Sequence, residues 1–292
     1  MKDLHEEITA QILTAIEGGR ESLDALWDNS LRLGIPYNYS TGKAYAGINI
    51  LTLWNTAARK GYEVNAWMTY KQAQEQGGQV RKGEKSTLGM FYKPIEDKNQ
   101  EAESDEENGT RRRMMAKAFY LFNVAQIDGL EGLPEPKAPT FSPIADAEAI
   151  ITASGAEVRH GGTRAFYSPA MDFVQMPSLD RFQSAENYYA TILHELTHWT
   201  GHKNRLDREY GKRFGDRAYA FEELIAELGT AFLCARLGLV GATLEGHADY
   251  IADWLKIMGN DKRAVMTAAS QAERAADYLA QMLEASAAQK AG

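Results

Sequence analysis

The sequence predicts an α+β protein with two domains joined by a short linker. Four of the eight prolines fall between Pro134 and Pro143, and such a concentration of proline is typical of a linker. Helical and strand patterns alternate before this segment, whereas short strands followed by long helical patterns occupy the sequence after it. We therefore predict a first domain over residues 1–127, a linker over 128–143 and a second domain over 144–292.

The first domain is expected to contain short helices and a pair of strands. Apolar residues at helical spacing that end at glycine predict helices, and runs rich in aromatic residues predict strands. The predicted helices cover residues 4–17, 49–60 and 67–76, and the predicted strands cover residues 87–94 and 118–124. Between the two strands, residues 96–109 are strongly acidic, and we expect them to form a solvated loop.

The second domain is expected to begin with a helix and a small sheet and to continue with long helices. The predicted strands cover residues 157–159, 164–167 and 172–175, and the predicted helices cover residues 144–154, 184–199, 216–237, 244–258 and 262–284. An edge strand of such a sheet could hold another extended chain by main-chain pairing.

The motif that carries chemistry is H-E-x-x-H, formed by His194, Glu195 and His198. Residues four apart share one face of a helix, so both imidazoles can reach a single zinc ion. Glu195 would act as the general base on a metal-bound water without ligating the metal itself. Ser184 is a suitable N-cap for the helix, and Gly201 is a natural end. The alternative is an ordinary helix with two histidines on one face.

A catalytic zinc site needs a third protein ligand, and one candidate for it is local. The sequence from His194 to Gly201 matches the beginning of the metzincin pattern, in which a third histidine follows the glycine. That position is Asn204 in this chain, and His202 follows the glycine too closely to reach the same ion.

The other candidate lies in the apolar helix predicted over residues 216–237. Carboxylates in a buried helix are costly unless they are paired or bind a metal. The arrangement is similar to that of gluzincins, in which a second helix supplies a glutamate ligand and an acidic group four residues later orients a ligand histidine. This similarity implies Glu223 as the third ligand and Glu227 as the residue behind it. Glu222 and Glu227 remain alternatives for the ligand, and ion pairs with Arg217 or Arg236 would explain the same residues without a metal.

Composition indicates a soluble globular protein without a membrane span. The hydrophobic fraction is 44% and the charged fraction 25%, and no run of about 18 apolar residues occurs. The N-terminus lacks the apolar segment of a signal peptide, and one cysteine excludes an intrachain disulfide, so we expect a cytoplasmic protein. The cysteine, Cys234, lies among apolar residues and is expected in the core.

The net charge is −8, but the charge is unevenly distributed, and the sequence contains a basic region that could bind a polyanion. Nine Lys or Arg against three Glu occur over residues 30–95, interleaved with Tyr and Trp. Cations that follow phosphates and rings that stack on bases suit single-stranded nucleic acid, although the same residues would also fit a solvated face and a core. The expected DNA-binding residues are Lys43, Tyr45, Trp54, Arg81, Lys82 and Lys85.

Three runs of sequence resemble the ArdC-type antirestriction proteins. They are Y-S-T-G-K-A-Y-A-G-I-N from Tyr39, W-M-T-Y-K-Q-A-Q-E-Q-G-G-Q-V-R-K-G-E-K from Trp67, and Y-Y-A-T-I-L-H-E-L-T-H-W-T-G-H-K-N-R from Tyr188. The resemblance implies a single-stranded-DNA-binding domain followed by a zincin-like metallopeptidase domain. It further implies a protein of a conjugative plasmid that protects incoming DNA from host restriction.

Two hypotheses of function follow. In the first, the chain is a peptidase with one zinc ion, for which manganese or cobalt could substitute, and its substrate is a host restriction-system protein or another peptide. Tyr219 and His247 are candidates for stabilising the oxyanion. In the second, the chain is a module that coats DNA, and its metal is structural or dispensable for catalysis.

Overall fold

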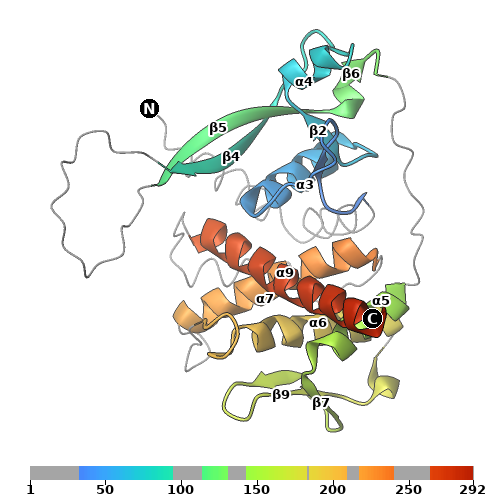
Figure 1. The fold of residues 1–292 in the computed structure, drawn as a ribbon, viewed down its shortest axis with the longest axis vertical. Helices are drawn as coiled ribbons and strands as arrows, with labels where there is room; N and C mark the ends of the chain where they lie inside the picture. The colour runs from blue at the N-terminus through green and yellow to red at the C-terminus, as the bar shows by residue number, and fades with distance from the viewer. Residues whose placement is uncertain are drawn as a thin grey trace, which may run out of the picture.

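The structure is a computed structural model that describes residues 33–94, 114–130, 143–182, 184–208, 217–239 and 264–291. The predicted helices over 4–17 and 244–258, the acidic stretch over 96–109 and most of the predicted linker lie outside these residues. The described part consists of an upper region of strands with two helices and a lower region of four helices with a small sheet (Figure 1). This mixture confirms the predicted α+β class.

Helix α3 (Ile48–Lys60) is the central helix of the N-terminal region and agrees with the prediction. Its end is fixed by Gly61, which adopts a left-handed conformation (φ 66°) and donates to the last carbonyls of the helix. Its start is held to the neighbouring sheet by Asn49, whose side-chain amide donates to the carbonyl of Met90 and accepts from the N–H of Met90, both at 2.8 Å.

The predicted helix over residues 67–76 is partly wrong. Ala66–Met68 form strand β2, and only Tyr70–Glu75 form a helix, α4. The boundary is set by Thr69, which forms a capping box with Gln72 and starts the helix there. The apolar residues before Thr69 instead pair with strand β5, so tertiary pairing overrides the helical pattern.

A four-stranded sheet with the order β1-β2-β5-β4 forms the top of the molecule. Its edges are β1 (Tyr37–Asn38) and β4 (Thr87–Pro94), and β5 (Met114–Asn123) extends the predicted second strand toward the N-terminus. Strands β4 and β5 pair antiparallel along eight residue pairs and form a long hairpin (Figure 1). A separate pair joins β3 (Gln79–Val80) to β6 (Ile127–Asp128), so Asp128, which we assigned to the linker, lies in a strand.

The C-terminal region places a small sheet beneath a group of packed helices (Figure 1). Strands β7 (Glu157–His160), β9 (Phe173–Met176) and β8 (Phe166–Ser168) form the sheet in that order, which makes β8 an edge strand. The helices agree closely with the predicted ones and are α5 (Pro143–Ser154), α6 (Ala185–Thr200), α7 (Arg217–Leu237) and α9 (Ala264–Ala291). No helix within the described part of the chain is both long and apolar enough to span a bilayer.

One hydrophobic core joins the two regions. The same buried cluster contains residues of α3 and β4 together with residues of α6, α7 and α9. Trp54 of α3 contacts Phe232 of α7, with ring centroids 5.7 Å apart. The carboxylate of Glu273 in α9 accepts a hydrogen bond from the N–H of Gly47, at the start of α3. The two regions therefore share a buried interface.

Candidate metal centre

The H-E-x-x-H motif lies on α6, which the structure forms as expected. Ser184 caps the helix by accepting from the N–H of Asn187 at 3.2 Å, and Gly201 follows the last turn. His194 and His198 project from one side, with ring centroids 4.9 Å apart. Most of the helix is buried, so the imidazoles are held by packing as well as by helical spacing.

Helix α7 brings carboxylates up to the same side of α6. The two helices come close at Gly229, where a Cβ would lie 2.6 Å from Cγ2 of Thr197. Thr197 sits between the two histidines in sequence, so this contact fixes the separation of the helices beside the site. The close approach explains a glycine in the middle of an otherwise apolar helix.

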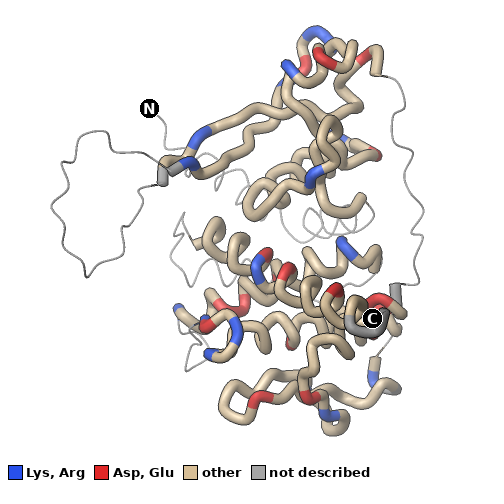
Figure 2. Tube along the Cα trace, viewed as in Figure 1, with Lys and Arg blue, Asp and Glu red and all other residues tan. Residues whose placement is uncertain are grey.

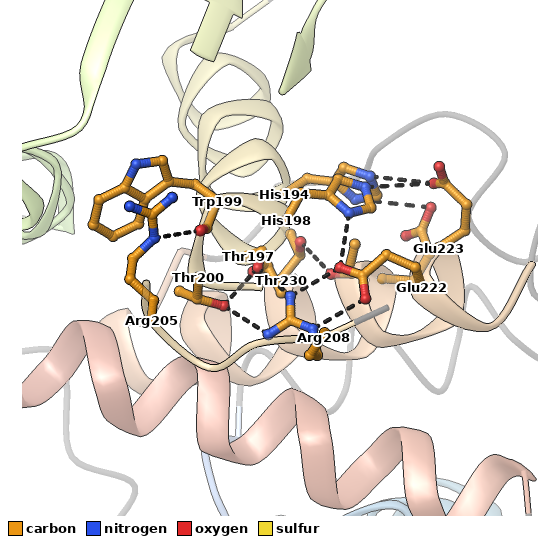
Figure 3. A network of polar contacts seen from close by, with 12 residues as sticks. His194, Thr197, His198, Trp199, Thr200, Arg205, Arg208, Glu222, Glu223 and Thr230 are labelled. Carbon is orange, nitrogen blue, oxygen red and sulfur yellow. Dashed lines mark hydrogen bonds and ion pairs between the residues drawn. The ribbon is translucent and has the colours of Figure 1, made fainter. Parts of the chain in front are cut away.

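His194, His198 and Glu223 converge on one point. Their nearest ligand atoms all lie within 4.8 Å of one another, and these residues form a group suited to holding a metal ion. Oε2 of Glu223 is 3.6 Å from Nε2 of His194 and 3.7 Å from Nε2 of His198. Figure 3 shows both imidazoles turned toward Glu223. Burial opposes ionisation of Glu223, but the two imidazoles outweigh it and hold its pKa far below the usual range.

Each imidazole also faces a second carboxylate with its other nitrogen. Nδ1 of His198 lies 3.2 Å from Oε1 of Glu222, and Nδ1 of His194 lies 4.0 Å from Oε1 of Glu227. Glu222 is in turn held by Arg208, whose Nε and Nη2 donate to its two oxygens at 3.0 and 2.8 Å (Figure 3). Glu222 is within hydrogen-bond distance of His198, and a carboxylate in that position orients a ligand histidine and fixes which nitrogen carries the proton, whereas the distance from Glu227 to His194 is too long for a hydrogen bond.

Glu195 is buried beside the two histidines. Burial raises the pKa of its carboxyl above the usual range, although the neighbouring imidazoles act in the opposite direction. The carboxylate accepts a hydrogen bond from the main chain of Tyr167 in β8. A carboxylate whose pKa is raised is a stronger base than a free carboxylate, which suits a group that accepts and returns a proton.

A pocket of about 390 Å³ opens at this point. It is bounded on one side by the residues of the H-E-x-x-H motif with Glu222 and Glu223, and on the other by the segment around β8. Arg164 and Tyr219 also line it, and Tyr219 hydrogen-bonds Glu223. Burial and the nearby carboxylates raise the pKa of Tyr219 well above its usual range, so the phenol stays protonated. The pocket thus combines a metal-ligand set, a carboxylate base and an edge strand.

The strand β8 is anchored to the end of α6 by a partly buried ion pair. Arg205 contacts the carboxylate of Asp172, and the hydroxyl of Tyr167 donates to Oδ1 of Asp172 at 2.8 Å. The guanidinium of Arg205 lies 3.8 Å from the ring centroid of Trp199 and donates to the Trp199 carbonyl (Figure 3). This network sets the position of the main chain that contacts Glu195.

The other ligand candidates lie apart from this cluster. His202 accepts a hydrogen bond from the N–H of Asn204 through Nδ1 at 3.3 Å, and neither residue belongs to the metal-ligand group among the described residues. Glu222 and Glu227 face Nδ1 of His198 and of His194, respectively, although Glu222 also lines the pocket. His247 lies outside the described residues. The sequence analysis missed Arg208 and the contact of Glu222 with His198, although two consecutive glutamates in a buried helix were a usable signal.

The residues predicted to bind DNA have different environments. Lys43, Lys82 and Lys85 are exposed, and Tyr45 is half-buried. Arg81 is exposed but paired with Glu84 and Asp128, and it donates to the carbonyl of Ala125. Lys and Arg residues lie around α4 and on the β4–β5 hairpin (Figure 2).

The prediction for Trp54 is wrong. Its side chain is only 1% exposed, packs on Phe232 and donates through Nε1 to the carbonyl of Gly34 at 3.0 Å. A ring enclosed in this way has no free face for a base. Trp67 is buried as well, so neither of these tryptophans belongs to a nucleic-acid surface.

Two known families match this chain, one over its N-terminal part and the other over its C-terminal part. Residues 2–122 match the N-terminal domain of anti-restriction factor ArdC, and residues 145–271 match a zincin-like metallopeptidase. The chain resembles the Mn(II)-bound crystal structure of the antirestriction protein ArdC of plasmid R388, with a TM-score of 0.77 and 40% identity over 96% of this chain and 98% of that one. The metal-free crystal structure of that protein gives a TM-score of 0.76.

Two kinds of relative are found among other proteins. An uncharacterized protein of Sinorhizobium fredii, y4eC, is 41% identical over 95% of this chain and 91% of its own length. A DNA primase of Escherichia coli, TraC, is 38% identical over 95% of this chain, which spans only 27% of the primase. Since both halves of the chain match and a solved structure matches almost from end to end, this chain is a member of the ArdC antirestriction family.

Proposed function

We propose that this chain is an antirestriction protein whose second domain is a metal-dependent peptidase and whose first domain binds single-stranded DNA. The observation that carries the peptidase is the convergence of His194, His198 and Glu223 beside the buried Glu195. The family membership supports a role in protecting DNA from restriction, and the zincin-like match supports a divalent metal. A host restriction-system protein is the substrate that this role favours.

The residues present fit a catalytic metal ion. Two imidazole nitrogens and one carboxylate form the ligand set of many hydrolytic zinc sites, which leave a position open for water. The side chains behind them support this fit, because Glu222 would fix the imidazole of His198 with Nε2 directed at the ion, and Glu227 faces Nδ1 of His194 at 4.0 Å. We propose zinc as the ion, and a carboxylate ligand also tolerates manganese, the metal in the solved ArdC structure.

A bound divalent ion would supply Lewis-acid polarisation of a peptide carbonyl and acidification of water. Glu195 is placed to take the proton of the attacking water and to return it to the leaving amine. Strand β8 would align the peptide by main-chain pairing along its outer edge, with which no other described strand pairs.

The test of the peptidase compares the wild type with Glu195→Gln and Glu223→Ala. Metal content, peptide hydrolysis and plasmid protection against a restriction enzyme in cells are measured for each. We expect Glu195→Gln to keep the metal and lose hydrolysis by about 10²-fold or more, because only the proton acceptor is removed. Glu223→Ala should lose both.

Loss of metal from Glu195→Gln would show that Glu195 does not have the proposed role. If Glu195→Gln lacks hydrolysis but protects plasmids as the wild type does, protection does not depend on proteolysis. DNA coating would then be the leading explanation.

The second function, binding of single-stranded DNA, is favoured by the exposed lysines of the N-terminal region and by the match to the N-terminal domain of ArdC. The full chain must be used, because the shared core would leave Trp54 uncovered in an isolated N-terminal fragment. We expect binding to weaken steeply as salt rises, since released counterions drive it. Binding that is absent, or indifferent to salt, would contradict the proposal.

A further inference from the structure

We propose that one face of the β4–β5 hairpin is a stacking site for the unpaired bases of single-stranded nucleic acid. Its rings are Tyr45, Phe91 and Phe119, which we call the aromatic row, and its cations are Lys93 and Lys117. The inference rests on the DNA binding proposed above and gives that function a location. Of these five residues, only Tyr45 was expected from the sequence.

The aromatic row is a continuous set of rings at the protein surface. Tyr45 and Phe119 are nearly parallel, at 16°, with centroids 6.3 Å apart, and Phe91 follows with its centroid 5.9 Å from that of Phe119. Phe91 is 45% exposed, whereas Tyr45 and Phe119 are half-buried. Contiguous rings that solvent can reach in part form an apolar patch, and such patches are candidate contact surfaces.

The strand register places lysines on the same face. Residues directly opposite in an antiparallel pair point to the same side, and Lys117 is opposite Phe91. Lys93 lies two residues beyond Phe91, so it points the same way. Both lysines are exposed, and no ion pair joins either of them to another described residue. They supply the positive charge that the phosphates of a strand lying on this face would need.

Two features hold the rings in place without a ligand. A Cβ on Gly89, the residue opposite Phe119, would lie 2.5 Å from the Phe119 ring, so the ring is packed directly over the glycine backbone. The hydroxyl of Tyr45 accepts from Nδ2 of Asn38 at 3.0 Å. Rings fixed in this way lose little conformational entropy when a base stacks on them.

The opposite face of the hairpin offers no such site. Tyr92 and Tyr120 are exposed there, but the register places the pair Met90–Ala118 between them, and Met90 is buried in the shared core. Tyr120 is 58% exposed, more than any residue of the aromatic row. It is therefore a matched control, being an exposed aromatic residue on the same strand as Phe119 but on the other face.

The ligand chemistry follows from these groups. Every base has a π-face, so stacking on aromatic rings is tolerant of sequence, while lysines follow the backbone phosphates. In a duplex the base faces are already stacked on each other. The aromatic row should therefore prefer single strands to duplexes and show weak sequence preference.

The test measures the anisotropy of a short fluorescein-labelled oligo(dT) with the full-length protein. We expect Phe119→Ala and Phe91→Ala each to weaken binding by about tenfold, the usual order for loss of one stacked base. Tyr120→Ala should bind as the wild type does. Phe119→Leu, which keeps apolar bulk without a ring, should also weaken binding, and circular dichroism checks that each variant is folded.

Salt dependence and an abasic oligomer separate stacking from charge. Lys117→Gln should lower the slope of log affinity against log salt by about 0.7, the value for one phosphate contact in a single strand. Phe119→Ala should leave the slope unchanged. An abasic oligomer retains the phosphates without bases, so Phe119→Ala should not affect its binding.

Several outcomes would overturn the inference. If the Phe119→Ala and Phe91→Ala variants bind oligo(dT) as tightly as the wild type does, the aromatic row has no role in DNA binding. Equal losses in Tyr120→Ala and Phe119→Ala, or an equal loss on the abasic oligomer, would exclude stacking at this face. Absence of oligo(dT) binding by the wild type would instead contradict the DNA-binding function itself.

Discussion

At the metal centre the two histidines differ in how closely a carboxylate holds the nitrogen that faces away from the ion site. Glu222 is tied to His198 at 3.2 Å and to Arg208 by two hydrogen bonds, whereas Glu227 stands 4.0 Å from His194. Burial opposes ionisation of Glu222, but the hydrogen bonds of His198 and Arg208 and their charges outweigh it and keep the pKa of that carboxyl below the usual range. His198 should consequently be the more rigidly held ligand.

We predict that Glu222→Gln and Glu227→Gln weaken metal affinity by about 10- to 100-fold, the usual effect of removing such a partner. Competition with a fluorescent chelator measures the affinity. Glu284→Gln, an exposed change on α9, serves as the matched control and should have no effect. Unchanged affinity in Glu222→Gln would show that His198 is oriented by the helix alone.

A second prediction concerns the ion pair between Arg205 and Asp172. The hydrogen bond from Arg205, together with that of Tyr167, lowers the pKa of Asp172 below its usual value of about 3.9. A depressed carboxyl pKa stabilises the fold above the unfolded pKa, and this contribution disappears as pH falls through the folded pKa. Asp172→Asn, which tolerates the positive φ of 52° at this position, should remove that part of the acid dependence.

The measurement is the free energy of unfolding of wild type and Asp172→Asn between neutral pH and about pH 3. The two curves should converge at low pH, because the wild-type carboxyl is then protonated. Curves that stay parallel over the whole range would show that the pair contributes nothing to the pH dependence.

At the scale of elements, the site depends on how closely α6 and α7 approach. Glycine at 229 allows the approach, because Cγ2 of Thr197 occupies the space that a side chain would need. Thr197 also donates to the carbonyl of Leu193 at 2.8 Å, so it cannot turn away without losing that hydrogen bond. The contact therefore transmits any separation of the helices to the ligands.

We predict that Gly229→Ala lowers the free energy of unfolding by about 1–3 kcal/mol, the usual cost of overpacking, and weakens metal binding. The double variant Gly229→Ala with Thr197→Ser removes the clashing methyl group but keeps the hydroxyl. It should recover part of both losses, as measured by denaturant unfolding and chelator competition. If the double variant is no better than the single one, the helix contact is not the cause.

On the scale of the whole molecule, the shared core decides how the domains behave. Trp54 and Phe232 belong to one buried cluster that spans both regions. Removing a large core ring costs about 3–5 kcal/mol, and here the loss falls on the interface between the regions. The two regions should consequently unfold together.

We predict that Phe232→Ala lowers the melting temperature of a single calorimetric transition, which near- and far-ultraviolet circular dichroism should report at the same temperature. The variant should also lose DNA affinity at elevated temperature, although Phe232 lies in the metallopeptidase region. Two separate transitions, of which only one shifts, would contradict a common core.

Local sequence patterns predicted much of the secondary structure of this protein and part of its candidate site. The histidine spacing, the serine cap and the glycine stop were sufficient to predict α6 and to place His194 and His198 on one side of it, because helical geometry fixes which residues share a face. Local sequence patterns also predicted the strand over 87–94 and most helix boundaries. The family resemblance, carried by three runs of residues, is confirmed by the comparisons.

The tertiary structure alone decided what no local pattern contains. It placed Glu223 at the histidines and Glu222 behind them, because that assignment depends on the rotation of α7 against α6. It put Trp54 in the core and Phe91 and Phe119 on the surface, whereas composition treats these aromatic residues alike. It placed Trp67, which we predicted at the start of a helix, in strand β2, because this residue pairs with β5. Spacing along the chain determines local geometry, but contacts between distant segments depend on packing, which only the folded molecule specifies.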